Sequence, residues 1–399
     1  MKHRWLLAAL GGLFALAGCG SGSGTPPDDT PPDAVITEWD GATCPSGSRL
    51  AAVDPVDLFA RWCEAGGVPS GPYGRWFPPG PDAGGAVEVL GAYAAGERSG
   101  DWTWWFEPDA DADPGAKPEV RRTGRYDAGK RTGVWREWDG EGEVWQQGAY
   151  VDDQRDGEWV IQGAGGEVRE RRQYAAGLAT GEWTVLGSAG AVLERTHWVA
   201  GEREGAYERF HENGELAEKG GYHDDLREGA WQSWYPSGQV QESGDYARGL
   251  RQGPWVGRTA DGRADYEGAY EAGEPAGQWI LWDYQFDIAR YRRGSFLDGY
   301  KVGEWTTWWA ASGDPAASDV QSEVEHYADG VLDGAFHAWW PDGQDFSDGG
   351  YAGGAQHGAW TFWYESGVVA AEVTYVFGEI RESQCWDEEN IPVECDEVL

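Results

Sequence analysis

The chain has 399 residues, of which 69 are acidic and 31 basic, giving a formal net charge of −38 at pH 7. A surface of this sign repels nucleic acid and anionic lipid headgroups, so we expect no nucleic-acid partner. Acidity keeps a chain with 26 tryptophans soluble. A cationic partner or a divalent metal is the alternative reason for the charge.

Residues 1–18 have the pattern of a secretory signal peptide. Lys2 and Arg4 form a positive end, and an apolar stretch follows that is too short and glycine-rich to span a bilayer. The segment ends Leu16-Ala17-Gly18-Cys19, which is similar to a bacterial lipobox. This similarity implies cleavage before Cys19 and lipidation of its thiol, whereas ordinary cleavage would leave Cys19 free.

The expected mature chain is therefore lipid-anchored in a bacterial cell envelope and meets the membrane only through its lipid. Gly20 after the cysteine resembles proteins forwarded to the outer membrane, on its periplasmic side or at the cell surface. Removing residues 1–18 takes away two basic and no acidic residues, which leaves 29 − 69 = −40 charges. Residues 19–43, rich in glycine and serine and then in proline and aspartate, are predicted to be a tether.

Four cysteines remain, in one pair before and one pair after the central part of the chain: Cys44, Cys63, Cys385 and Cys395. An even count in an oxidising envelope indicates disulfides. Three connectivities are possible, and we favour Cys44 with Cys63 and Cys385 with Cys395 because each pair lies beside one terminus. A reactive thiol or zinc site is the alternative, but no Cys-x-x-Cys spacing supports it.

Between the cysteine pairs, one aromatic position recurs eleven times, with glycine two residues before it and another aromatic residue nine before it. We call these positions the anchors: Trp102, Trp135, Trp159, Trp183, Tyr207, Trp231, Trp255, Trp279, Trp305, Phe336 and Trp360. Anchors are 24 residues apart from Trp135 to Trp279. Such a period predicts a tandem array, over residues 71–384, between an N-terminal cap (44–70) and a C-terminal cap or tail (385–399).

Each repeat predicts one β-hairpin. Two aromatic and β-branched runs alternate with turn residues, and glycine recurs both seven residues after the anchor and six before it. Asp153 and Asp225 replace the second glycine, and aspartate tolerates the positive φ of a tight turn. We expect about twelve hairpins side by side in an elongated, twisted antiparallel sheet, an all-β fold.

The residue alternation of strands places aromatic side chains on both faces of this sheet. Those beyond the anchors are our candidates for contact with a partner, while packing between strands is the alternative role of each. The candidates are Trp104, Trp105, Trp308, Trp309, Trp339, Trp340, Trp363 and Tyr364. Gln162, Leu186 and Arg258 occupy the position three after their anchors and are expected to mark repeats not used for contact.

The pattern Gly-x-Trp-x-x-Trp-Tyr-x-x-Gly, followed by Gly-x-Tyr-x-x-Gly-x-x-x-Gly-x-Trp, resembles the bacterial variant of MORN repeats. Repeats of this type occur in YwqK-type antitoxin-like proteins, and the resemblance covers residues 71 to about 384. It implies association with membranes, scaffolding and dimerisation, or neutralisation of a partner toxin. The segment from Cys44 to Cys63 also looks like an N-terminal cap found with such arrays in bacterial lipoproteins.

We find no catalytic constellation and expect the protein not to be an enzyme. The sequence lacks a Gly-x-Ser-x-Gly elbow, a His-Glu-x-x-His motif and a Walker loop. His197 and His326 share a repeat register but lie five repeats apart, so no metal site is predicted. Asp109, Asp111 and Asp113 alternate as in a calcium loop, but Pro114 and Val120 stand where that loop needs glycine and glutamate, which favours a solvated insertion without cofactor.

The expected function is that of a non-enzymatic, envelope-anchored lipoprotein that binds a protein, peptide or glycan, or acts as a scaffold, through its aromatic repeat surface. The alternative is an antitoxin or immunity-like protein that neutralises a partner toxin. A third possibility is a surface spacer without a specific ligand.

Overall fold

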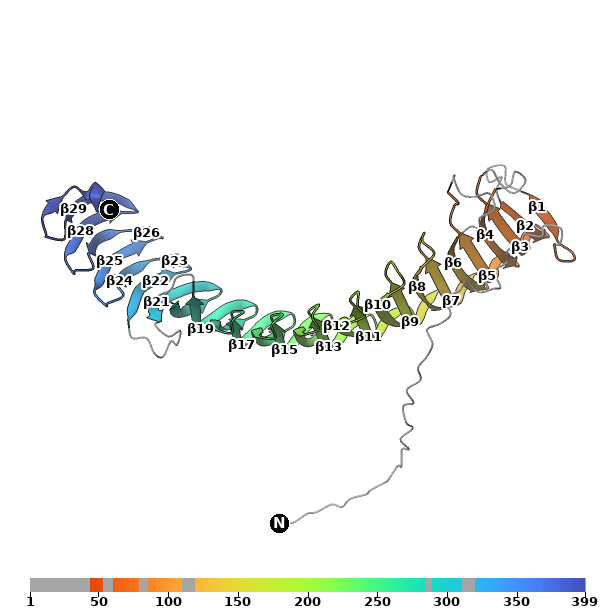
Figure 1. Ribbon diagram of the computed structural model, residues 1–399, viewed down its shortest axis with the longest axis horizontal. Helices are drawn as coiled ribbons and strands as arrows, with labels where there is room; N and C mark the ends of the chain where they lie inside the picture. The colour runs from red at the N-terminus through yellow and green to blue at the C-terminus, as the bar shows by residue number, and fades with distance from the viewer. Residues whose placement is uncertain are drawn as a thin grey trace, which may run out of the picture. The chain divides into compact units, whose positions relative to one another are not determined.

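A computed structural model describes residues 44–52, 60–78, 85–109, 119–284, 289–310 and 320–398. Within these ranges the protein is all-β, with 30 strands in one antiparallel sheet that does not close on itself. Consecutive strands pair with one another along the chain (Figure 1). The described part of the chain contains no α-helix, only a 3-10 turn, η2 (Cys395–Glu397). The predicted all-β array is confirmed.

The strands of the first half of the sheet are β1 (Arg49–Ala52), β2 (Ala60–Ala65), β3 (Val68–Trp76), β4 (Val87–Ala94), β5 (Glu97–Trp105), β6 (Val120–Asp127), β7 (Lys130–Trp138), β8 (Val144–Val151), β9 (Gln154–Gln162), β10 (Val168–Ala175), β11 (Leu178–Leu186), β12 (Val192–Val199), β13 (Glu202–Phe210), β14 (Leu216–His223) and β15 (Leu226–Trp234).

Those of the second half are β16 (Val240–Ala247), β17 (Leu250–Arg258), β18 (Ala264–Glu271), β19 (Glu274–Asp283), β20 (Ala289–Leu297), β21 (Tyr300–Ala310), β22 (Gln321–Ala328), β23 (Val331–Leu332), β24 (Gly334–Trp339), β25 (Asp345–Ala352), β26 (Ala355–Gln356), β27 (Gly358–Trp363), β28 (Val369–Val376), β29 (Glu379–Trp386) and β30 (Pro392–Val393).

Two kinds of turn alternate along the sheet. The short turn has two central residues with positive φ, as at Arg248 (φ 51°) and Gly249 (φ 80°), which is the type I′ geometry that suits the twist of a hairpin. Asp153 (φ 68°) and Asp225 (φ 64°) adopt the same conformation, as predicted. The longer turn runs from Tyr235 to Gln239, whose backbone atoms bond at 2.8 Å, with Gly238 at φ 81°.

A β-bulge precedes every anchor. Strand pairing in β16 and β17 jumps from Gly244–Trp255 to Asp245–Gln252, so Gly253 and Pro254 are extra residues in β17. Gly253 has φ 67°, and the glycine two before the anchor has positive φ in all eleven repeats. Residues other than glycine rarely adopt this conformation. The glycine two residues before each anchor therefore marks a bulge.

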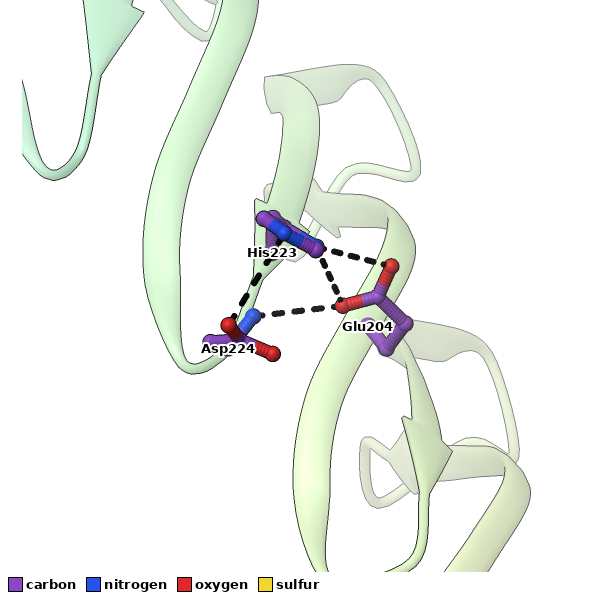
Figure 2. A group of neighbouring side chains, drawn as sticks. All are labelled: Glu204, His223 and Asp224. Carbon is purple, nitrogen blue, oxygen red and sulfur yellow. Dashed lines mark hydrogen bonds and ion pairs between the residues drawn. The ribbon is translucent and has the colours of Figure 1, made fainter.

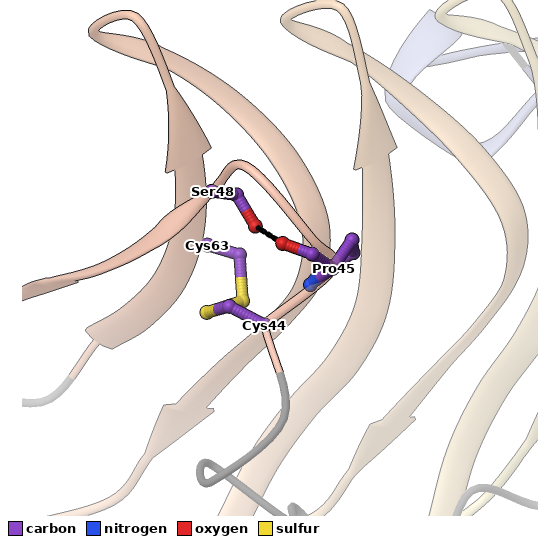
Figure 3. The surroundings of a disulfide bond; sticks show 4 residues. All are labelled: Cys44, Pro45, Ser48 and Cys63. Carbon is purple, nitrogen blue, oxygen red and sulfur yellow. Dashed lines mark hydrogen bonds between the residues drawn. A yellow bond between two sulfur atoms is a disulfide. The ribbon is translucent and has the colours of Figure 1, made fainter.

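The caps are extensions of the same sheet. The structure joins Cys44 to Cys63 and Cys385 to Cys395, the pairing expected. Figure 3 shows the first disulfide beside a turn in which the Ser48 hydroxyl donates to the Pro45 carbonyl at 2.6 Å. Strand β3 begins three residues before the predicted start of the array, and β29 passes through its predicted end at residue 384.

Several expectations concern residues that the structure does not describe: the signal segment 1–18, Cys19, the tether 19–43, Asp111 and Asp113. Among the described residues, no helix has the length and apolar character needed to cross a membrane.

Candidate functional site

Eight of the nine anchor tryptophans lie against a glycine of the preceding strand, eleven residues earlier in the chain. A Cβ placed on Gly244 would come within 2.2 Å of the Trp255 ring, so only glycine fits beneath the indole. The same relation joins Gly91, Gly124, Gly148, Gly220, Gly268, Gly294 and Gly349 to their anchors. The result is a row of indoles pressed against the backbone, with Trp255 only 2% exposed.

The indole N–H of most anchors bonds to the backbone. Trp255 Nε1 donates to the Asp245 carbonyl at 3.1 Å, and the same bond recurs at Trp159, Trp183, Trp231, Trp279, Trp305 and Trp360. The residue nine before the anchor is a tyrosine in nine of the eleven repeats. Tyr246, for example, meets the indoles of Trp231 and Trp255 edge-on, with ring centroids 5.8 and 5.2 Å apart. Such edge-to-face contacts fix the rings in a rigid lattice.

Three repeats depart from the glycine rule, and each also changes its anchor. Arg172, Thr196 and Glu325 stand where the other repeats have glycine. Two of their anchors are the smaller Tyr207 and Phe336, and the third, Trp183, is incompletely buried and lies 4.7 Å from Trp198. Where the glycine is replaced by a residue with a side chain, the anchor ring is therefore smaller or less completely buried.

A column of cations covers this aromatic lattice although the protein is acidic overall. The residue four before the anchor is basic at Arg98, Arg131, Arg155, Arg203, Arg227, Arg251 and Lys301. The Arg251 guanidinium lies 4.1 Å from the centre of the Trp255 ring and 5.2 Å from that of Tyr270. It also bonds to both oxygens of Glu242, at 2.8 and 2.9 Å. Burial over Trp305 lowers the pKa of Lys301, the only lysine in the column.

The predicted contact residues fall into two groups. Trp104 and Trp105 are buried, at 5% and 6% exposure, and Arg122 covers Trp104 at 4.2 Å. Trp308, Trp309, Trp339, Trp340, Trp363 and Tyr364 are partly exposed. Of the eight predicted contact residues, those with partly exposed rings therefore all lie in the C-terminal repeats.

Some of these C-terminal rings also hold neighbouring hairpins together. Trp340 Nε1 donates to the Trp363 carbonyl at 3.3 Å, and the Tyr364 hydroxyl donates to the Trp386 carbonyl at 2.9 Å. Trp339 stacks on His337 with ring centres 4.1 Å apart. His337 in turn bridges two carboxylates, Asp348 at 2.8 Å and Asp345 at 2.9 Å, one at each ring nitrogen.

Sequence reasoning missed several exposed aromatic residues, among them Trp145 and Phe346. Trp145 in β8 is 40% exposed, and it is the one tryptophan of the described ranges among the exposed large hydrophobic residues. Phe346, at the same position ten after an anchor, is also 40% exposed and packs on Trp340. This position lies at the bulge beside the longer turn, and the aromatic residue there could have served as a signal.

Among the described residues, Glu204, His223 and Asp224 form a group with metal-ligand chemistry. Figure 2 shows Glu204 facing His223 and Asp224 from the neighbouring strand. His223 Nδ1 lies 3.0 and 3.1 Å from the Glu204 carboxylate oxygens, and the Asp224 amide donates to Glu204 at 3.2 Å. The hydrogen bond with His223 lowers the pKa of Glu204, and the same bond raises the pKa of His223.

A recurring structural role explains the position of Glu204. The side chain three before an anchor accepts a hydrogen bond from a turn amide twenty residues later: Glu228 from Arg248 at 2.7 Å, Gln252 from Ala272 and Asp333 from Gly353, both at 3.1 Å. His197 and His326, which share a register, likewise each bond to a carbonyl at the next bulge, at 2.8 and 2.9 Å. These groups stabilise turns and bulges.

Comparison with known proteins supports the type of repeat. A family model described as MORN repeat variant matches residues 203–224, 227–247 and 356–376. MORN repeats are therefore present in this chain, and the first two matches lie within β13 to β16, on either side of Asp225. No curated protein matches the chain.

Solved structures match over most of the chain but with little agreement in space. The crystal structures of TcdB2-TccC3-TEV and of TcdB2-TccC3 are 11% and 9% identical to it, with TM-scores of 0.15 and 0.14, and 86% and 87% of this chain covered. The Tc holotoxin pore of Photorhabdus luminescens is 10% identical, with a TM-score of 0.15 and 84% of this chain covered. The chain spans 20–24% of the length of these proteins.

Proposed function

We propose that the protein is a non-enzymatic lipoprotein of the cell envelope that binds a protein, peptide or glycan partner, or acts as a scaffold, through its repeat surface. The observation that carries this proposal is the group of partly exposed rings in the C-terminal repeats, on a sheet held rigid by the anchor lattice. Rings already fixed by packing and hydrogen bonds lose little conformational freedom on binding.

The lipobox-like sequence at Cys19 supports the envelope anchor. A lipid at this residue would tether the repeat sheet and leave its faces open to a partner. Within the described residues, the ionisable groups that lie close together serve as turn caps and ion pairs, which favours binding over catalysis.

The test is affinity capture from an envelope extract of the source organism, with residues 20–399 as bait and competition by unlabelled protein. One saturable protein partner supports binding, and a growth defect that disappears when that partner is deleted identifies it as a toxin. A partner that cannot be competed, or none, contradicts the proposal and favours a passive spacer.

The site is tested by a second bait with Trp308→Leu, Trp339→Leu and Trp363→Leu. The matched control changes the same repeat position in other repeats, with Gln162→Ala, Leu186→Ala and Arg258→Ala. Far-UV circular dichroism checks that both baits fold. Retention of the partner by the bait with Trp308→Leu, Trp339→Leu and Trp363→Leu would contradict this choice of surface.

A further inference from the structure

A row of exposed apolar residues follows the short turns, along the side of the sheet where these turns lie. Five residues that come directly after a short turn are 45–60% exposed, and we call them the turn ridge: Leu178, Leu226, Leu250, Tyr300 and Val331. None of them belongs to the aromatic lattice or to the rings considered above. Apolar side chains gathered in one row on a surface indicate an interaction site rather than chance exposure.

The ridge side chains pack against glycines of the short turns. A Cβ placed on Gly249 would lie 3.4 Å from Leu226, one on Gly273 would lie 3.3 Å from Leu250, and one on Gly330 would lie 3.1 Å from Tyr300. Each ridge side chain thus rests against the glycine of the next short turn. Along the seven short turns from 175–178 to 328–331, the row is interrupted at the second and fifth turns, where Glu202 and Glu274 take the same position.

The side of the sheet formed by the short turns is strongly acidic as well as apolar. The twelve short turns from 94–97 to 376–379, counted as the two central residues and one on each side, hold 12 acidic and 2 basic residues, a net charge of −10. A second copy of this chain would bring like charge against like charge, and anionic lipid would be repelled in the same way. The charge complements a cationic partner.

The spacing along the edge restricts the shape of that partner. Neighbouring short turns are two strands apart, which is about 9.6 Å at the usual strand spacing. An extended chain of the polyproline II type advances about 9.3 Å in three residues. Every third residue of such a chain would meet one turn.

We propose that the turn ridge binds an extended, cationic polypeptide segment that carries an apolar side chain at every third residue. Its apolar residues cover the ridge side chains, and its basic residues pair with Glu202, Glu274 and acidic turn residues other than Asp152, Asp153 and Asp225, which pair with Lys130, Arg131 and Arg203. This inference rests on the proposed binding function and places a second contact surface on the same sheet.

The probe is a fluorescein-labelled peptide with seven copies of Leu-Pro-Lys, measured by fluorescence anisotropy on the chain from residue 20. A peptide of the same composition with its leucines clustered is the control for spacing. The ridge variant has Leu178→Ser, Leu226→Ser and Leu250→Ser. The matched variant changes exposed residues elsewhere, with Val134→Ser, Val185→Ser and Ile391→Ser.

We expect the ridge variant to bind the probe at least about tenfold more weakly, because three apolar contacts are lost, and the matched variant to stay within about twofold. Glu202→Gln with Glu274→Gln should reduce the salt dependence of binding. Equal loss in both serine variants, unchanged binding by the ridge variant, or equally tight binding of the clustered peptide would each overturn the inference. A dimer that depends on the ridge in analytical ultracentrifugation would also overturn it.

Capture from the envelope extract separates this inference from the proposed function. If the wild-type bait and the ridge variant retain the same competable partner equally, the binding function stands and the ridge assignment is wrong. If the wild-type bait retains nothing competable, the proposed function fails, and the peptide assay still decides whether the ridge binds cationic segments.

Discussion

The indole of Trp231 lies so close to the backbone of Gly220 that a Cβ on this glycine would come within 2.2 Å of the ring. A Cβ on the next residue, Gly221, would have its nearest neighbour, the Gly205 carbonyl oxygen, at 3.5 Å, an ordinary contact distance. Two adjacent glycines of β14 therefore have different roles, one beneath a ring and one beside open backbone.

Gly220→Ala should destabilise the protein by about 3 kcal/mol, because the added methyl group forces the Trp231 ring off the sheet. Gly221→Ala is the matched control and should change the free energy of unfolding by less than about 1 kcal/mol. Urea unfolding gives both values, and hydrogen exchange in β14 and β15 locates the effect. Equal costs at the two positions would contradict the role assigned to Gly220.

The natural exceptions suggest how to rescue this damage. Thr196 lies where other repeats have glycine, and its anchor is Tyr207. Gly220→Thr combined with Trp231→Tyr copies that pair and should recover at least about 1 kcal/mol relative to Gly220→Thr alone, because the smaller ring leaves room for the side chain. Additive costs in a double-mutant cycle would mean that ring size and side chain are not coupled.

The sequence predicts the repeat well because residues with turn-forming properties recur with the period of the repeat. Glycine and aspartate mark the two turns, and the positive φ at Asp153 and Asp225 follows from residue type alone. The contact of Gly220 with Trp231 cannot be deduced in this way, since it joins two strands whose register shifts at a bulge. The repeat motif includes Gly220, but only the strand register shows that the Trp231 ring lies against it.

The candidate site is predicted less well than the fold, for a related reason. Trp104 and Trp105 look like a surface cluster in sequence, yet strand packing buries both. The turn ridge escapes detection because its members are ordinary residues such as Leu226, 24 residues from the next equivalent position. Exposure depends on which turn neighbours which, and a one-dimensional pattern does not record this.

Asp225 adopts φ 64° in a turn where other repeats have glycine. Its carboxylate accepts bonds from the Arg203 amide at 3.0 Å and from its guanidinium at 2.9 Å. Asp225→Ala keeps the unfavourable φ and loses these bonds, so we expect a cost of about 1–2 kcal/mol. Asp225→Gly loses the bonds but relieves the backbone, and its cost should stay below about 1 kcal/mol.

The same aspartate also predicts a dependence on pH. The hydrogen bond from the Arg203 amide is the main cause that lowers the pKa of Asp225. A carboxyl whose pKa is lower in the folded state stabilises the protein above its unfolded pKa of about 3.9 and loses this effect as the pH falls through the folded value. The stability difference between wild type and Asp225→Asn should therefore shrink below about pH 4. A difference that is constant from pH 7 to pH 3 would contradict this.

The ion pair of Glu204 and His223 predicts a pH dependence of the opposite sign, because the contribution of His223 to stability is lost as the pH rises. The bond with Glu204 raises the pKa of His223 above its ordinary value of about 6.5. The histidine contribution is complete below that value and is lost as the pH rises through the folded pKa, while the glutamate contribution is lost in acid. Glu204→Gln should move the His223 titration midpoint in NMR toward 6.5. An unchanged midpoint would mean that the carboxylate does not hold the proton.

Removal of the second disulfide should loosen one end of the sheet without melting its centre. Cys385 in β29 is 3% exposed and packs in a cluster with Trp360, Val373 and Tyr375. Stability in a repeat array is mainly a sum of nearest-neighbour terms, so the loss of the bond to Cys395 should act over one or two hairpins. In Cys395→Ser we expect amide exchange to accelerate at least about tenfold in β28 and β29 and to stay unchanged in β14 to β17. The matched control is the double variant Cys44→Ser, Cys63→Ser reduced with dithiothreitol, because reduction then breaks only the bond between Cys385 and Cys395 and leaves Cys395 unchanged. Faster exchange in β14 to β17 as well would show that the array unfolds as one cooperative unit, and the nearest-neighbour account would be wrong.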